Sequence, residues 1–135
     1  MQKFNLLDGT ILKVPDNHPT RKQLNASAKK GAAWITSLLG ENWVNLINLE
    51  ELDMSSYMSD VLGQLAHLLL PDVEGADYFD VLRSDLLEYR QEISLGFAPH
   101  VGTAGSFSYL ILTDVWVRLI TKLREEYGNS LQDSV

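Results

Sequence analysis

The chain contains no cysteine, which excludes disulfide bonds, thiolate nucleophiles and cysteine-ligated zinc. Long hydrophobic runs are also missing. Apolar stretches such as Leu68–Leu70 stop after a few residues, whereas a membrane-spanning helix needs about 20. Residues 1–5 lack the basic and apolar segments of a signal peptide. We therefore expect a cytoplasmic protein with no membrane segment.

The length and composition are those of one ordinary globular domain. The chain has 135 residues, of which 45% are hydrophobic and 21% charged. A chain of this size buries about two-thirds of its unfolded surface, enough to fold without a metal or a disulfide. We predict one mainly α domain over residues 1–135, a bundle of four to five helices with an N-terminal β-hairpin. Its parts are a hairpin over residues 1–15, a helical bundle over 20–127 and a frayed tail over 129–135.

The hairpin is predicted around Asp8-Gly9, because glycine accepts the positive φ of a tight turn and aspartate tolerates turn geometry. A three-residue loop over 7–9, with Gly9 as the bulge residue, would pair Phe4 with Leu12. This register gathers the apolar side chains of both strands on one face, whereas a two-residue turn would mix a lysine into it. A lone hairpin is marginally stable, so its apolar face should pack on helices.

Apolar residues at three- and four-residue spacing predict the helices. Thr20 is a suitable N-cap for a long helix that ends at Gly40. Residues 41–52 suggest a short helix and a buried connector. Ser55 or Ser56 would cap a third helix. The remaining predicted helices span about Asp77–Leu95, stopped by Gly96, and a segment from a Ser106 cap to about Tyr127.

Charge is distributed unevenly within a net charge of −7. Residues 1–49 contain six Lys and Arg against three carboxylates, whereas residues 50–92 contain eleven carboxylates against two arginines. The acidic half would repel a phosphate backbone, so no nucleic-acid binding is expected. The basic residues of 21–30 and much of the acidic segment fit solvated helix faces. The alternative is a surface for a basic protein, including one that itself binds nucleic acid. Its candidate residues are Asp77, Asp80, Asp85, Glu88 and Glu92.

One turn has the composition of an anion site. Free amide groups at a helix N-terminus attract phosphate or carboxylate, and a glycine-rich stretch precedes the last predicted helix. The stretch lacks the lysine and spacing of a nucleotide-binding P-loop. Its candidate residues are Gly102, Thr103, Gly105 and Ser106, with His100 nearby.

No catalytic or metal-binding constellation stands out. The three histidines lack the spacing that places metal ligands on one helix face. Asp60, Gln64 and His67 would share a helix face, but a polar surface stripe explains them better. No serine has the context of a nucleophile elbow. We expect no metal, no cofactor and no enzymatic activity.

Several short motifs occur in a fixed order. They are a Trp-bearing helix at Trp34, LDMS at 52–55, VLGQL at 61–65, LGF at 95–97 and a stretch that ends at Trp116. In this order the chain resembles, over about residues 31–120, small proteins of Gram-positive bacteria and their phages. A cysteine often precedes VLGQ in that family, whereas Asp60 stands here, so no thiol-based role transfers. The resemblance implies a phage or prophage context and no chemistry.

Three functions are compatible with these observations. The first is a non-enzymatic acidic binding protein, an inhibitor of phage or prophage type that acts on a host or defence protein. The second is a small ligand-binding domain or enzyme that uses the anion turn at 102–106. The third is a phage structural or assembly protein that oligomerises through an exposed helix face. The sequence leaves the oligomeric state open.

Overall fold

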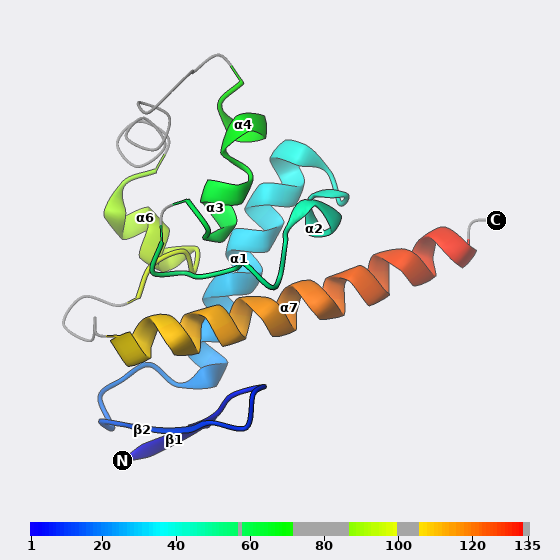
Figure 1. Ribbon diagram of the computed structural model, residues 1–135. Helices are drawn as coiled ribbons and strands as arrows, with labels where there is room; N and C mark the ends of the chain where they lie inside the picture. Colours follow the sequence, from blue (N-terminus) through cyan, green and yellow to red (C-terminus); the bar gives the residue numbers. More distant parts are fainter. Residues whose placement is uncertain (57, 72–86, 100–105, 134–135) are drawn as a thin grey trace.

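Two long helices and an N-terminal hairpin form the framework of the fold (Figure 1). The computed structural model describes residues 1–56, 58–71, 87–99 and 106–133. Its elements are β1 (Gln2–Asn5), β2 (Ile11–Val14), α1 (Arg21–Leu39), α2 (Trp43–Leu46), α3 (Val61–Gln64), α4 (Ala66–Leu69), α6 (Tyr89–Ser94) and α7 (Ser106–Asp133). The predicted mainly helical fold with an N-terminal hairpin is confirmed.

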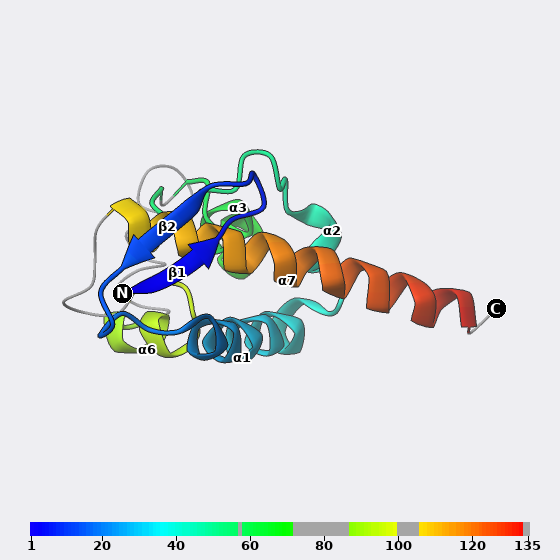
Figure 2. The same ribbon diagram turned by 90° about the horizontal axis from the view of Figure 1, so that it is seen from below.

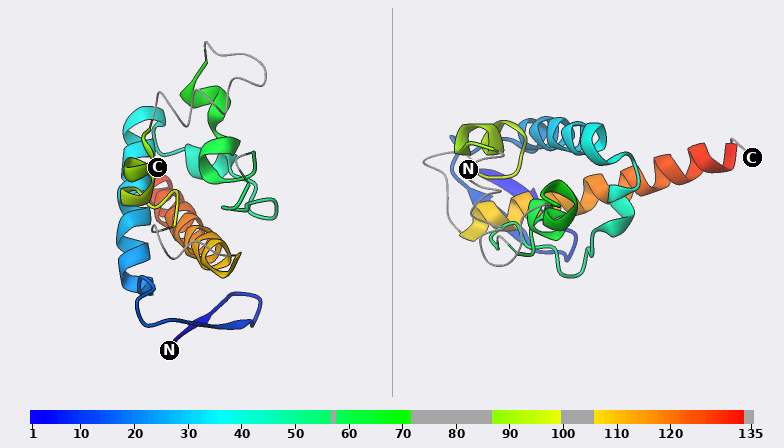
Figure 3. Two further views of the ribbon diagram at one scale, coloured as in Figure 1. Left: turned by 90° about the vertical axis from the view of Figure 1, so that its left-hand side faces the viewer. Right: turned by 90° about the horizontal axis from the view of Figure 1, so that it is seen from above.

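The two long helices cross, and the smaller elements pack around the crossing. The hairpin lies on one side of α7, and α3 and α4 lie on the other side (Figures 1 and 3). α6 packs beside α1, and α2 contacts both long helices. Among the described helices, none combines the length and the apolar character that a bilayer crossing requires.

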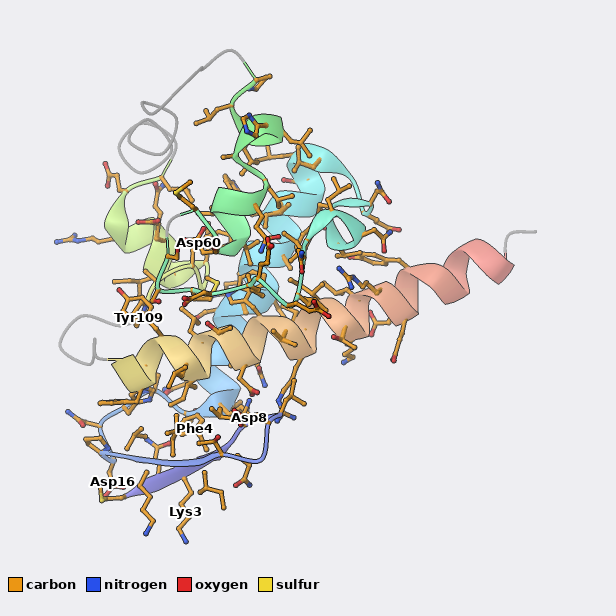
Figure 4. The ribbon with its side chains drawn as sticks, in the orientation of Figure 1. Lys3, Phe4, Asp8, Asp16, Asp60 and Tyr109 are labelled. Atoms are coloured by element: carbon orange, nitrogen blue, oxygen red, sulfur yellow. The ribbon has the colours of Figure 1, made fainter. Side chains whose placement is uncertain are left out.

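The hairpin has the predicted register. Phe4 pairs with Leu12, the Leu6 amide donates to the Thr10 carbonyl at 2.8 Å, and Gly9 has φ +91°. The Phe4 side chain is only 3% exposed, which confirms that the face of the hairpin carrying Phe4 is the buried, apolar one. Figure 4 shows Phe4 directed from the hairpin towards α7, while Lys3 points away from the body.

α1 begins and ends where the sequence predicts. The Thr20 hydroxyl accepts from the Gln23 amide at 3.1 Å, and the Gln23 side chain accepts from the Thr20 amide at 2.8 Å. This reciprocal capping satisfies backbone donors that the first helical turn leaves unpaired. The helix stops at Gly40, whose amide still donates to Thr36.

The third predicted helix is wrong in its start and in its continuity. Asp60 is the N-cap, because its carboxylate accepts from the Gly63 amide at 2.6 Å, and α3 therefore begins at Val61. The amide of Ser55 donates to Asp53 in a turn instead of opening a helix. The helix is then interrupted at Leu65, which separates α3 from α4. The helix is therefore capped by Asp60 and not by either of the predicted serines.

The predicted helix over 77–95 is described only in its last part. Residues 77–86 lie outside the described residues. Leu87 and Glu88 are not helical, so an unbroken helix through them is wrong. Glu88 has extended backbone angles and forms a capping box with Gln91, which starts α6 at Tyr89.

A glycine contact locks α6 and its following turn onto α1. A Cβ atom at Gly31 would clash with the Leu95 carbonyl oxygen and reach 3.1 Å from the Phe97 ring. Gly96 has φ +78°, and a Cβ there would lie 2.6 Å from the Ala28 amide nitrogen. Glycine is required on both surfaces, because the two backbones approach too closely for side chains.

The turn after α6 is also held by α7. The Trp116 indole N–H donates to the Gly96 carbonyl at 2.6 Å, and both groups are buried. The Phe97 ring stacks on Trp116 with centroids 5.3 Å apart, and the Trp34 and Phe97 rings meet edge-on with centroids 6.0 Å apart. The LGF motif therefore joins α1 and α7, and it packs against the fully buried Trp116.

α7 extends beyond the rest of the molecule. It begins at Ser106, as predicted, and continues to Asp133, past the predicted end near Tyr127 and into the predicted tail. Its 28 residues span about 42 Å, against about 28 Å for the 19 residues of α1. The C-terminal end of α7 therefore projects past the other elements (Figures 1 and 2).

Candidate functional site

The predicted acidic face is only partly described. Asp77, Asp80 and Asp85 lie outside the described residues. Glu88 is exposed at the start of α6, whereas Glu92, within α6, is only 6% exposed. Glu92 is therefore withdrawn from solvent, and the prediction that it belongs to an exposed acidic face is wrong. The partner-binding role of these three aspartates stays a prediction.

The predicted anion turn is also largely outside the described residues. This applies to His100, Gly102, Thr103 and Gly105. Ser106 is the first residue of α7. The anion-binding role of this turn stays a prediction.

The described residues do form a strongly acidic groove, which we call the acidic groove. Its volume is about 520 Å³, and it lies between the loop that follows α2 and the first turns of α7. Three carboxylates, one hydroxyl and one leucine come from the loop, and a tyrosine, a leucine and a threonine come from the helix. The lining residues are Glu50, Glu51, Leu52, Asp53, Ser55, Tyr109, Leu110 and Thr113.

Hydrogen bonds hold the acidic loop in place on α7. The Thr113 hydroxyl donates to the Tyr109 carbonyl at 2.9 Å and accepts from the Met54 amide at 2.9 Å. Asp53 closes the next turn by accepting from the amide of Ser55 at 2.9 Å and from its hydroxyl at 2.6 Å. Figure 4 shows Tyr109 near the start of α7. The groove is thus built from fixed backbone on both sides.

The first part of the same loop is shaped by Asn48. Its side-chain oxygen accepts from the Glu50 amide at 3.0 Å and from the Glu51 amide at 3.3 Å. Gln64 of α3 fixes Asn48 in turn, accepting from its amide at 2.7 Å. The carboxylates of Glu50 and Glu51 are left free of this network, on exposed residues at the rim.

The lining of the acidic groove suits a partner that carries positively charged groups next to apolar side chains. Three carboxylates line it, and among the residues that the structure describes no lysine, arginine or histidine does so. Leu110 is 53% exposed, and Leu52 is buried beneath the loop. Carboxylates accept charge-assisted hydrogen bonds from ammonium and guanidinium groups. The exposed leucine offers a partner apolar surface to cover.

A buried serine–histidine pair resembles a nucleophile and its base, and sequence reasoning missed it. The His18 Nδ1 lies 2.8 Å from the Pro19 carbonyl oxygen and donates to it, so Nε2 accepts from the Ser108 hydroxyl, 3.2 Å away. The two residues are 4% and 3% exposed. The Ser108 hydroxyl is not presented to a substrate, and the pair anchors the connector after β2 on α7.

A buried carboxylate joins the hairpin to both long helices. Asp114 accepts from the Arg118 Nε at 2.7 Å, the Arg21 Nη1 at 3.0 Å and the Leu7 amide at 2.9 Å. Each arginine also donates to the Asn5 carbonyl at 3.0 Å. Arg21 is therefore structural, and the solvated basic face predicted for 21–30 is left with its three lysines. The four-residue spacing of Asp114 and Arg118 was visible in the sequence, but the distant Arg21 was not.

The described residues contain no group of three His, Asp or Glu side chains that would hold a metal ion. Asp60, Gln64 and His67 do not form the expected polar stripe. Asp60 is 2% exposed and caps α3, Gln64 binds the Asn48 backbone, and His67 is exposed on α4. The aspartate at the position before VLGQ therefore has a helix-capping role.

No family model matches this chain, and no curated protein or solved structure is significantly similar to it.

Proposed function

We propose that this chain is a non-enzymatic binding domain that takes up a basic segment of a partner protein in the acidic groove. The observation that carries the proposal is the lining of this groove, where three carboxylates accompany exposed Leu110 and no described lining residue is a cation. The order of the sequence motifs supports a phage or prophage setting. In that setting the protein would act in the cytoplasm as an inhibitor of a host or defence protein.

Charge and apolar contact would contribute differently to such a complex. Exposed ion pairs contribute about 0–1 kcal/mol each, so the carboxylates mainly accelerate encounter and reject acidic partners. Covering the exposed part of Leu110 contributes about 1–2 kcal/mol. We therefore expect a partner segment with lysine or arginine beside a large apolar side chain, and an association rate that falls as salt rises.

A peptide-binding experiment tests this proposal. The probe is a labelled peptide of alternating arginine and leucine, and the control probe has glutamate in place of arginine. Association is followed by stopped-flow fluorescence at low salt. The test variant combines Glu50→Gln, Glu51→Gln and Asp53→Asn. The last change keeps a side-chain oxygen for the Ser55 turn.

A matched variant removes three exposed carboxylates elsewhere, with Asp16→Asn, Glu41→Gln and Glu125→Gln. Both triple variants have the same net charge. We expect the groove variant to slow association of the basic peptide about tenfold, and the matched variant to change it little. Equal slowing in both variants would show that only overall charge matters and would refute the acidic groove as the site.

A further inference from the structure

A second groove, of different chemistry, lies between α1 and α7. It has a volume of about 340 Å³ and adjoins a smaller hollow of about 150 Å³ that shares Lys29, Leu119 and Lys122 with it. We call the two together the α1/α7 groove. Its lining residues are Asn25, Lys29, Ala32 and Ala33 of α1, and Arg118, Leu119, Lys122, Leu123, Glu126 and Tyr127 of α7.

The floor of the α1/α7 groove is apolar. Ala32 and Leu119 are buried at its base, Ala33 is exposed, and Leu123 and Tyr127 are half-buried along α7. The small side chains of α1 leave room above them. α7 continues past the end of α1 (Figure 2). The shape and chemistry are those of a surface that accepts the apolar face of another helix.

Lysines from both helices stand at the sides of the α1/α7 groove, with one carboxylate, that of Glu126, among them. Lys29 projects from α1, and within the described part of the chain it has no ion pair. Lys122 stands on α7, where its ammonium group lies 3.9 Å from the carboxylate of Glu126, and the two side chains are 63% and 54% exposed. Such a pair contributes about 0–1 kcal/mol, so Lys122 can exchange it for another carboxylate. Arg118 is already committed to Asp114.

We propose that the α1/α7 groove binds an amphipathic helix of a partner protein, with acidic residues flanking an apolar stripe. Leucine-sized side chains of that helix would cover Ala33, Leu123 and Tyr127. Its carboxylates would meet Lys29 on one side and Lys122 on the other. A nucleic acid would satisfy the two lysines but would leave the apolar floor uncovered. This surface is opposite in charge to the acidic groove, and the proposal is independent of the proposed function.

Fluorescence anisotropy with the full-length chain tests the proposal. The probe is a labelled helical peptide of about four turns, with leucines on one face and glutamates on both sides of them. One control peptide has lysine for glutamate, and another has serine for leucine. The test variant is Lys29→Glu with Lys122→Glu. Its matched control is Lys22→Glu with Lys30→Glu, which alters exposed lysines of α1 outside the groove by the same total charge.

We expect the acidic amphipathic peptide to bind the wild-type chain and the matched control equally. The groove variant should bind it at least about tenfold more weakly. Both control peptides should also bind at least about tenfold more weakly to the wild-type chain. Equal affinity for the groove variant and its matched control would overturn the proposal, and so would full affinity for the serine-substituted peptide.

Two further measurements distinguish other occupants. If a second copy of the chain covers the α1/α7 groove, sedimentation velocity will show a dimer that Lys29→Glu with Lys122→Glu dissociates. If nucleic acid is the ligand, a single-stranded oligonucleotide will bind more tightly than the peptide and will be lost in the same variant. Either result would overturn the proposal of an acidic helix. A monomer that prefers the peptide to the oligonucleotide supports it.

Discussion

Adding one methyl group at Gly31 should destabilise the protein, although alanine favours a helix. The new Cβ would clash with the Leu95 carbonyl oxygen and lie 3.1 Å from the carbonyl carbon of the same residue. The turn cannot withdraw easily, because Trp116 binds the Gly96 carbonyl and Phe97 is stacked in the core. Overpacking of this kind costs about 1–3 kcal/mol, and we place Gly31→Ala at or above the upper end.

Helix propensity offsets part of this cost. Glycine to alanine inside a helix contributes about 1 kcal/mol of stability, so the net loss expected for Gly31→Ala is about 2 kcal/mol. For a domain of this size that loss lowers the melting midpoint by roughly 8 °C. Thermal and urea unfolding followed by circular dichroism would measure it.

Gly128→Ala is the matched control, because it makes the same chemical change inside α7 with no atom within 4 Å of the new methyl group. We expect it to leave the midpoint unchanged or to raise it, and to increase helix content. If Gly31→Ala proves as stable as the wild type, the close contact between α1 and the LGF turn is not present in solution.

Four further substitutions test the core, the hairpin anchor and the turn. Leu62→Asp and Trp116→Asp should each unfold the chain, because both sites are fully buried and an unpaired buried carboxylate costs several kcal/mol; a soluble variant with the wild-type midpoint would contradict this. Asp114→Asn should lower the free energy of unfolding by about 2 kcal/mol, because two arginines lose their counter-ion. The amides of the hairpin should then exchange hydrogen faster, and unchanged protection of these amides would contradict the prediction. The Thr10 amide donates to Asp8 and holds the pKa of that exposed carboxyl below its ordinary value of 3.8. The charged Asp8 carboxylate therefore stabilises the fold above its ordinary pKa, and this stabilisation is lost as pH falls through the lower pKa of the folded state. In Asp8→Asn the melting midpoint should therefore fall less steeply as the solution is made acidic.

Elements controlled by neighbouring residues could be predicted from the sequence. The register around Gly9 and the cap at Thr20 depend on interactions within a few residues, and both predictions are confirmed. The start of the third helix was predicted wrongly, because several polar residues in this stretch could each serve as its N-cap. Only the packed structure shows Asp60 buried at 2% exposure, where its carboxylate must accept hydrogen bonds.

The candidate sites depended on contacts that a sequence does not show. Acidic character was predicted from the carboxylates of residues 50–92, but the acidic groove exists because Met54 is bonded to Thr113, 59 positions away. The α1/α7 groove likewise brings Lys29 and Lys122 together from distant helices. The close approach of α1 to the turn after α6 also depends on distant residues, because Gly31 meets the carbonyl of Leu95.

Amide chemical shifts recorded during titration of the isotopically labelled chain with the arginine–leucine peptide test the central claim most directly. Binding in the acidic groove predicts saturable shifts confined to residues 50–55 and 109–113, which the combined Glu50→Gln, Glu51→Gln and Asp53→Asn variant abolishes at low salt. Shifts that spread over all acidic surfaces, or that persist at 50–55 in the variant, would contradict a specific cation-binding groove.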